Sequence, residues 1–155
     1  MNGDAALVGE GFSDEGIRWE LRAGGTKEDF ATLVSAWDNQ GPLGERGMAG
    51  PLLPHDHLVC LYTGGGDRGP RYVVARTDSS VSTLELKHDR GRKSDVPLFT
   101  VPALRGIRFG VAFIDRDVPV RAVVAHDEGG RVVDRLDVTE QQRVWDRFRL
   151  IAPKS

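Results

Sequence analysis

The segment PHDHLVC, residues 54–60, holds the densest group of side chains in this sequence that could do chemistry. His55 and His57 are two positions apart, so in an extended strand both imidazoles would point to one face, roughly 6–7 Å from each other. Such a pair suits two nitrogen ligands of a zinc-like metal ion. Asp56 and Cys60 would point to the opposite face, so this segment alone does not complete a site.

A complete metal site therefore requires another histidine, and His126 and His88 are the candidates. Both lie in segments rich in turn-forming residues, HDEGG and HDRG, where a polar His-Asp pair is expected without any metal. We keep a divalent-metal site at His55, His57 and His126, in a metal-dependent enzyme or a metal-binding barrel, as the alternative interpretation.

The other motifs of catalysis are missing from the sequence. The single cysteine, Cys60, lies in the apolar segment LVCLY, which is typical of a buried thiol with a raised pKa and low reactivity. There is no GxSxG nucleophile elbow, no P-loop and no GxGxxG between a strand and a helix. The Gly-rich TGGGDRG, residues 63–69, lacks a phosphate-binding lysine and predicts a hairpin turn. We therefore predict no catalytic set and no cofactor.

The composition is that of a soluble globular chain. Of its 155 residues, 39% are hydrophobic and 28% are charged, and the formal net charge is −2. The best basic patch is diluted by Asp89 and Asp95 and has no interleaved aromatic residue, so nucleic-acid binding is not predicted. It consists of Arg90, Arg92 and Lys93 with Arg105 and Arg108. No apolar run approaches the roughly 20 residues that cross a bilayer, and no signal peptide opens the chain. We expect no membrane contact and a cytoplasmic location.

The elements that must position these residues are mostly short strands. Apolar and polar residues alternate with a period of two in IRWEL (17–21). Further segments with strand-like patterns, separated by turn residues, continue to residue 136. The last pair, residues 120–136, predicts a hairpin that turns at 127–130. Eight or nine such strands predict one all-β domain over residues 16–155. The preferred prediction is an antiparallel β-sandwich, and a barrel is the second choice. Residues 1–15 predict a flexible tail.

A long connection interrupts the strands. Residues 38–56, DNQGPLGERGMAGPLLPHD, contain four glycines and three prolines and predict irregular structure. The segment also carries apolar residues that a flexible linker does not need: Leu43, Met48, Leu52 and Leu53. A loop of this length folds over the end of a core or contacts a ligand or partner, so these four are candidate contact residues.

One helix is predicted, over about 138–150, after the strands. Asp137 is a suitable N-cap and Glu140 stands three positions later, as in a capping box. Gln141, Val144, Trp145 and Phe148 share one face at i, i+3, i+4 and i+7 spacing, which predicts a face packed on the sheet. Trp145 and Arg149 are further candidates for contact with a partner or ligand.

Part of the predicted strand region resembles a known class of domains. YVVARTDSSVSTLELKHDRG, a VPLF strand and GVAFIDRDVPVRAVVAHDEGGRVV, within residues 72–136, resemble uncharacterised β-rich domains of high-GC bacteria. Those domains resemble immunoglobulin- or transthyretin-like sandwiches, and many lie outside the membrane anchor of a larger protein. The resemblance implies a sandwich and carries no catalytic motif.

The leading interpretation of function is a non-enzymatic interaction or ligand-binding module, with a protein partner or self-association expected. It depends on the missing catalytic set, the apolar residues of the long connection and the arginines of the helix. In such folds the function lies in loops and sites, so the fold class does not decide it.

Overall fold

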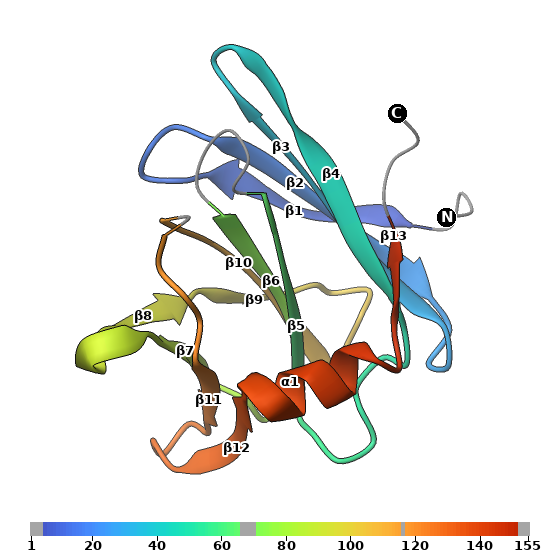
Figure 1. Ribbon diagram of the computed structural model, residues 1–155. Helices are drawn as coiled ribbons and strands as arrows, with labels where there is room; N and C mark the ends of the chain where they lie inside the picture. Colours follow the sequence, from blue (N-terminus) through green and yellow to red (C-terminus); the bar gives the residue numbers. More distant parts are fainter. Residues whose placement is uncertain (1–4, 66–70, 116, 152–155) are drawn as a thin grey trace.

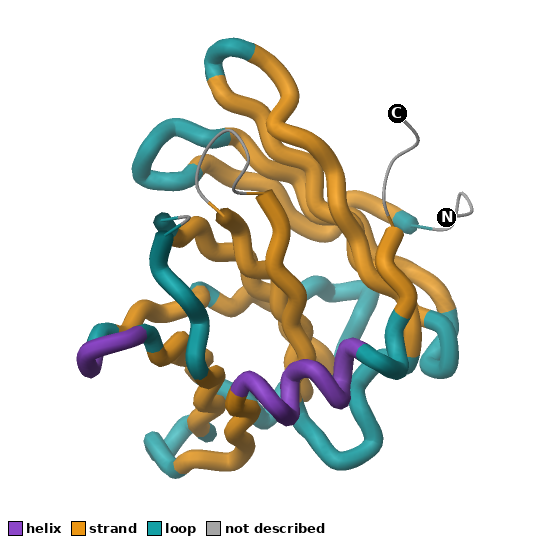
Figure 2. The backbone as a smooth tube through the Cα atoms, in the orientation of Figure 1, coloured by secondary structure: helices purple, strands orange, loops and turns teal. Residues whose placement is uncertain are grey.

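The protein is built from antiparallel strands and one short C-terminal α-helix, as predicted (Figures 1 and 2). The computed structural model describes residues 5–65, 71–115 and 117–151. Sheet A has the order β1 (Ala6–Phe12), β2 (Arg18–Gly25), β3 (Phe30–Asp38), β4 (Gly41–Gly50), β13 (Arg149–Ile151). Sheet B has the order β5 (Val59–Gly65), β6 (Arg71–Asp78), β10 (Ile107–Ile114), β9 (Leu98–Thr100). Sheet C has the order β12 (Val132–Asp137), β11 (Ala122–His126), β7 (Thr83–Lys87), β8 (Lys93–Val96). The helices are the 3-10 turn η1 (Asp89–Gly91) and α1 (Val138–Trp145).

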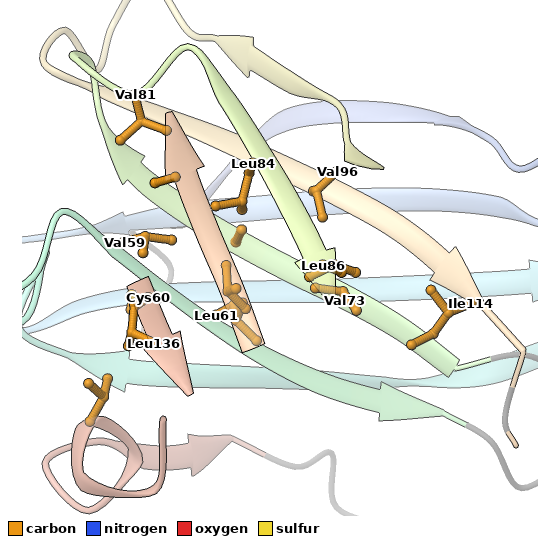
Figure 3. Close-up of a cluster of buried hydrophobic side chains, with 14 residues drawn as sticks. Val59, Cys60, Leu61, Val73, Val81, Leu84, Leu86, Val96, Ile114 and Leu136 are labelled. Carbon is orange, nitrogen blue, oxygen red and sulfur yellow. The ribbon is translucent and has the colours of Figure 1, made fainter. Parts of the chain in front are cut away.

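Sheet B lies between the other two sheets and is buried on both faces. Alternate side chains of a strand point to opposite faces, so neighbours such as Leu61 and Tyr62 enter different cores. Tyr62, Val74 and Phe109 pack with side chains of sheet A. The opposite core, between sheets B and C, is shown in Figure 3 and includes Val59, Leu61, Val73, Leu84, Leu86, Val123 and Leu136. All three sheets formed by the described strands are open, so the second choice, a barrel, is wrong for this part of the chain.

The predicted hairpin of residues 120–136 is confirmed as β11 and β12. Its turn is made by the Asp127 carboxylate, which accepts hydrogen bonds from the backbone N–H groups of Gly129 and Arg131. The turn predicted in TGGGDRG joins β5 to β6, which pair antiparallel, but residues 66–70 lie outside the described ranges.

The expected N-terminal tail is largely a strand instead. Residues 6–12 form β1 and pair with β2, with a register shift between Leu7 and Gly9. A Cβ atom on Gly9 would lie 2.6 Å from the ring of Phe99, so glycine permits the close approach of β1 to sheet B. Gly9, one of the glycines that suggested a tail, is therefore required for packing.

The predicted irregular connection is also partly wrong, because residues 41–50 form β4. A Cβ on Gly47 would lie 2.5 Å from the carbonyl oxygen of Thr32 on β3, so only glycine fits there. Gly44 has a φ of +118° next to a register shift in the β3–β4 pair, as in a β-bulge. The irregular part is reduced to the segment between Gly50 and Val59.

The helix is shorter than the predicted 138–150. It ends at Trp145, and residues 149–151 form β13 on the edge of β4, pairing Leu150 with Met48. Pairing with an available strand edge has overridden the local helical period at this end. No helix within the described ranges is long and apolar enough to cross a membrane.

Candidate functional site

The structure does not bring the three predicted metal ligands together. Residues 55 and 56 form a turn, and β5 begins only at Val59, so the alternation assumed for this segment is wrong. The side chain of His55 is 89% exposed, whereas that of His57 is 14% exposed. His126 ends β11 on sheet C. Within the described residues, no group of three His, Cys, Asp or Glu side chains is arranged to hold a metal ion.

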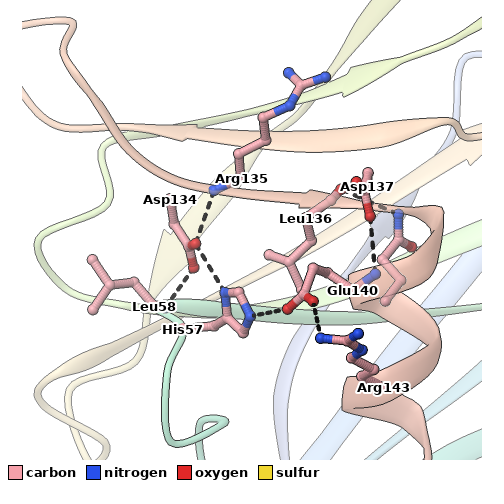
Figure 4. A network of polar contacts seen from close by, with 9 residues as sticks. His57, Leu58, Asp134, Arg135, Leu136, Asp137, Glu140 and Arg143 are labelled. Atoms are coloured by element: carbon pink, nitrogen blue, oxygen red, sulfur yellow. Dashed lines mark hydrogen bonds and ion pairs between the residues drawn. The ribbon is translucent and has the colours of Figure 1, made fainter.

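His57 instead lies between two carboxylates (Figure 4). Its Nδ1 is 2.9 Å from Oδ1 of Asp134 on β12, and its Nε2 is 3.0 Å from Oε2 of Glu140 on α1. Both ring nitrogens therefore face acceptors, and only the imidazolium form can donate to both. Burial lowers the pKa of His57, but the hydrogen bonds and charges of Asp134 and Glu140 outweigh burial and raise that pKa above its ordinary value.

The two carboxylates are themselves held in place. Asp134 accepts from the backbone N–H of Leu58 at 2.7 Å and from that of Arg135 at 2.8 Å. Glu140 is 3.1 Å from the guanidinium of Arg143. The network therefore joins the segment before β5, the strand β12 and the first turn of α1, and it leaves His57 no vacant ring nitrogen for a metal or substrate.

The start of α1 forms as its sequence predicts. Asp137 is the N-cap, and its carboxylate accepts from the backbone N–H of Glu140 at 2.9 Å. The side chain of Glu140 points to His57, so the carboxylate of the predicted capping box contributes to tertiary structure. Val144 is buried against the core between sheets B and C.

The end of α1 is attached to sheet B. The indole Nε1–H of Trp145 donates to the carbonyl oxygen of Leu61 on β5, the edge strand of that sheet. His57 at the first turn and Trp145 at the last thus fasten α1 across the side of the molecule where β4 and β5 come close (Figure 1).

A pocket of about 340 Å³ lies beside this helix. Its lining comes from β4, β5, α1, β13 and the turn between α1 and β13: Arg46, Met48, Tyr62, Thr63, Gln142, Trp145, Phe148 and Leu150. Most of these side chains are apolar or aromatic, and Leu150 is 66% exposed at the surface. The volume and lining are those of a small-molecule pocket, for which roughly 300–1,000 Å³ is typical.

The polar groups of the pocket are few. The hydroxyl of Tyr62 donates to the carbonyl oxygen of Arg46 at 3.1 Å. In an antiparallel pair, alternate residues direct both N–H and C=O away from the neighbouring strand. Because the carbonyl of Leu61 points outward to Trp145, the N–H and C=O of Thr63 also point outward, and Thr63 lines the pocket. Arg46, Gln142 and Thr63 are therefore the groups available to orient a ligand.

Two of the six predicted contact residues, Met48 and Trp145, line this pocket. Leu43 is half-buried near the tip of the β3–β4 hairpin, and Leu53 is half-buried before β5. Leu52 packs against the core between sheets A and B. Arg149 forms an ion pair with Asp29 at 2.8 Å, which lowers the pKa of that carboxyl through a hydrogen bond.

Of the eight lining residues, sequence reasoning missed six, among them Arg46 and Leu150. Both positions depend on β4 and β13, the strand assigned to a loop and the strand assigned to the helix. The glycines of β4 stand at every third position, 41, 44, 47 and 50, so this strand shows no period-two apolar pattern.

A buried arginine stands behind the pocket wall. Arg76 is 1% exposed, and its guanidinium donates to the carbonyl oxygens of Leu52 at 2.8 Å and Pro51 at 2.9 Å. It lies over the rings of Phe30 and Phe148, 5.1 and 5.5 Å from their centroids. Arg76 thus attaches the segment after β4 to sheet B and supports Phe148, which lines the pocket.

Comparisons with known proteins identify no relative: no family model, curated protein or solved structure matches this chain significantly. The resemblance of residues 72–136 to bacterial sandwich domains therefore stays a prediction.

Proposed function

We propose that this protein is a non-enzymatic ligand-binding module, and that its site is the pocket between β4, β5, β13 and α1. The observation that carries the proposal is an apolar pocket of about 340 Å³ with convergent polar groups at its wall. The occupant is a small amphipathic molecule, with its apolar part against Trp145 and Phe148 and its polar part near Arg46.

The construction of the pocket supports binding rather than catalysis. Its polar lining groups are an arginine, an amide and two hydroxyls, with no carboxylate, histidine or thiol among the described lining residues. The chemically reactive side chains lie elsewhere: His57 is bonded at both nitrogens, and Cys60 is buried in the core.

If apolar contacts drive binding, the affinity should increase with the length of the ligand's carbon chain. Each buried methylene group contributes about 0.8 kcal/mol, or about a fourfold gain in affinity. Isothermal titration calorimetry with hexan-1-ol, heptan-1-ol and octan-1-ol should therefore show Kd falling by about fourfold per added carbon until the pocket is full.

A pocket-filling variant makes this experiment specific. Gln142→Trp places a large ring at the pocket, whereas Arg147→Trp adds the same ring at an exposed position outside the lining. We expect Gln142→Trp to weaken octan-1-ol binding at least about tenfold and Arg147→Trp to leave it unchanged. Equal binding by both variants, or no dependence on chain length, would exclude the pocket as the site.

A further inference from the structure

We infer that the ligand of this pocket is an anionic amphiphile, a carboxylate with an apolar tail, whose head group is held by Arg46. The inference rests on the proposed function and adds the chemical class of the ligand. It follows from the charges and hydrogen-bonding groups around the pocket.

Arg46 is the only charged residue among those that line the pocket in the described part of the chain. Its side chain is exposed, and the guanidinium lies beside the hydroxyl of Tyr72 on β6, the strand that pairs with β5. One cation at the mouth of an apolar pocket complements a ligand with one negative charge. A guanidinium also matches a carboxylate in shape, because two parallel N–H groups can donate to its two oxygens.

Two acidic side chains in the described part of the chain, Glu45 and Asp146, are adjacent in sequence to lining residues, and each accepts a hydrogen bond. Glu45 precedes Arg46 on β4, and its carboxylate accepts from the hydroxyl of Ser35 at 3.1 Å, on the other face of sheet A. Asp146 accepts from the side-chain amide of Gln142 at 3.1 Å. The remaining polar groups of the wall include donors, the outward N–H and the hydroxyl of Thr63, which also suit an anion.

The aromatic walls strengthen this preference. Trp145 and Phe148 give the pocket an aromatic wall, and a charge pair in a less polar environment attracts more strongly than one in bulk water. A second hollow, of about 290 Å³, has the opposite character, since Asp14, Glu15 and Asp95 are among its lining residues. The two hollows differ in charge, so ligands of opposite charge can distinguish them.

The test uses three linear amphiphiles of similar tail length and different head group: octanoate, octan-1-ol and octyltrimethylammonium. By titration calorimetry at low salt, octanoate should bind about tenfold more tightly than octan-1-ol, because a charge-assisted hydrogen bond is stronger than a neutral one. Octyltrimethylammonium should bind this pocket more weakly than either.

Variants of Arg46 assign the effect to this residue. Arg46→Gln should weaken octanoate about tenfold and octan-1-ol much less, and Arg46→Lys should retain most of the octanoate affinity. Arg105→Gln, at an exposed loop position, removes the same net charge and should have no effect.

The outcomes separate this inference from the proposed function. If octan-1-ol binds as tightly as octanoate, or if Arg46→Gln and Arg105→Gln behave alike, the pocket binds an apolar molecule without preference for an anion and the inference is wrong. If none of the three ligands binds, the proposed function itself fails.

Discussion

Nε2 of His57 lies 3.0 Å from the carboxylate of Glu140, a residue 83 positions later in the chain. Through this contact the segment before β5 holds the first turn of α1, the helix that forms one wall of the pocket. The same imidazole bonds Asp134 on β12, so one side chain joins three parts of the fold. The histidine that suggested a metal ligand serves as a structural tie.

Replacing His57 should destabilise the protein. His57→Gln removes a charged donor from two carboxylates in a largely buried position, which we expect to lower the free energy of unfolding by about 1–3 kcal/mol. Urea unfolding followed by circular dichroism measures this loss. His55→Gln is the matched control, because its side chain is 89% exposed and should cost nothing measurable. Equal effects of the two substitutions would contradict the role of His57.

The contribution of His57 to the free energy of unfolding should also depend on pH. The pKa of His57 is raised in the folded protein, so the protonated form is favoured by folding. Its contribution is fully present below the unfolded value of about 6.5 and is lost as the pH rises through the folded pKa. The stability difference between the wild type and His57→Gln should therefore be larger at pH 6 than at pH 9. A difference that is constant over this range, or that grows toward pH 9, would contradict a charged His57.

Arg76 should be required to hold the segment between β4 and β5 in its folded position. Arg76→Met removes hydrogen bonds to the carbonyls of Pro51 and Leu52, and we expect a loss of about 2–4 kcal/mol in unfolding free energy. Hydrogen exchange of the backbone N–H groups in residues 51–58 should accelerate more than that of sheet C. Arg105→Met, at an exposed position, is the control. A neutral or stabilising effect of Arg76→Met would show that a hydrophobic side chain serves equally well there.

Cys60 should be inert in the folded protein. It is 2% exposed, and burial raises the pKa of its thiol, an effect that the nearby Arg76 opposes but does not cancel. A thiol-reactive disulfide reagent should label it only as fast as the protein unfolds, and immediately in denaturant. A Ser79→Cys variant, with a thiol at an exposed position, should react at once under native conditions. Rapid native labelling of Cys60 would contradict its burial.

Much of the fold follows from sequence patterns, and the exceptions share a physical cause. The alternation in IRWEL and the turn at Asp127 report local preferences, and both elements were predictable. β1 and β4 were not, because Gly9 and Gly47 serve as points of close approach rather than as loop residues. β13 continues a helical period and is a strand only because the edge of β4 is beside it.

The candidate site was predictable only in part. Met48 was identified as an apolar residue of a Gly- and Pro-rich connection and Trp145 from the apolar face of the predicted helix, and both line the pocket. The partners of His57 lie 77 and 83 residues away, and no local pattern encodes such contacts. Likewise, Arg46 enters the pocket wall because β4 lies close to β5, which is a property of the tertiary structure.

The most direct test of the pocket is the indole N–H signal of Trp145 in a two-dimensional proton–nitrogen NMR spectrum. The chain has three tryptophans, and Trp145→Phe identifies the signal. Titration with octan-1-ol should shift the Trp145 signal, whose N–H donates to Leu61 at the pocket wall, and leave those of Trp19 and Trp37 in place. An unchanged Trp145 signal, or equal shifts of all three, would contradict binding in this pocket.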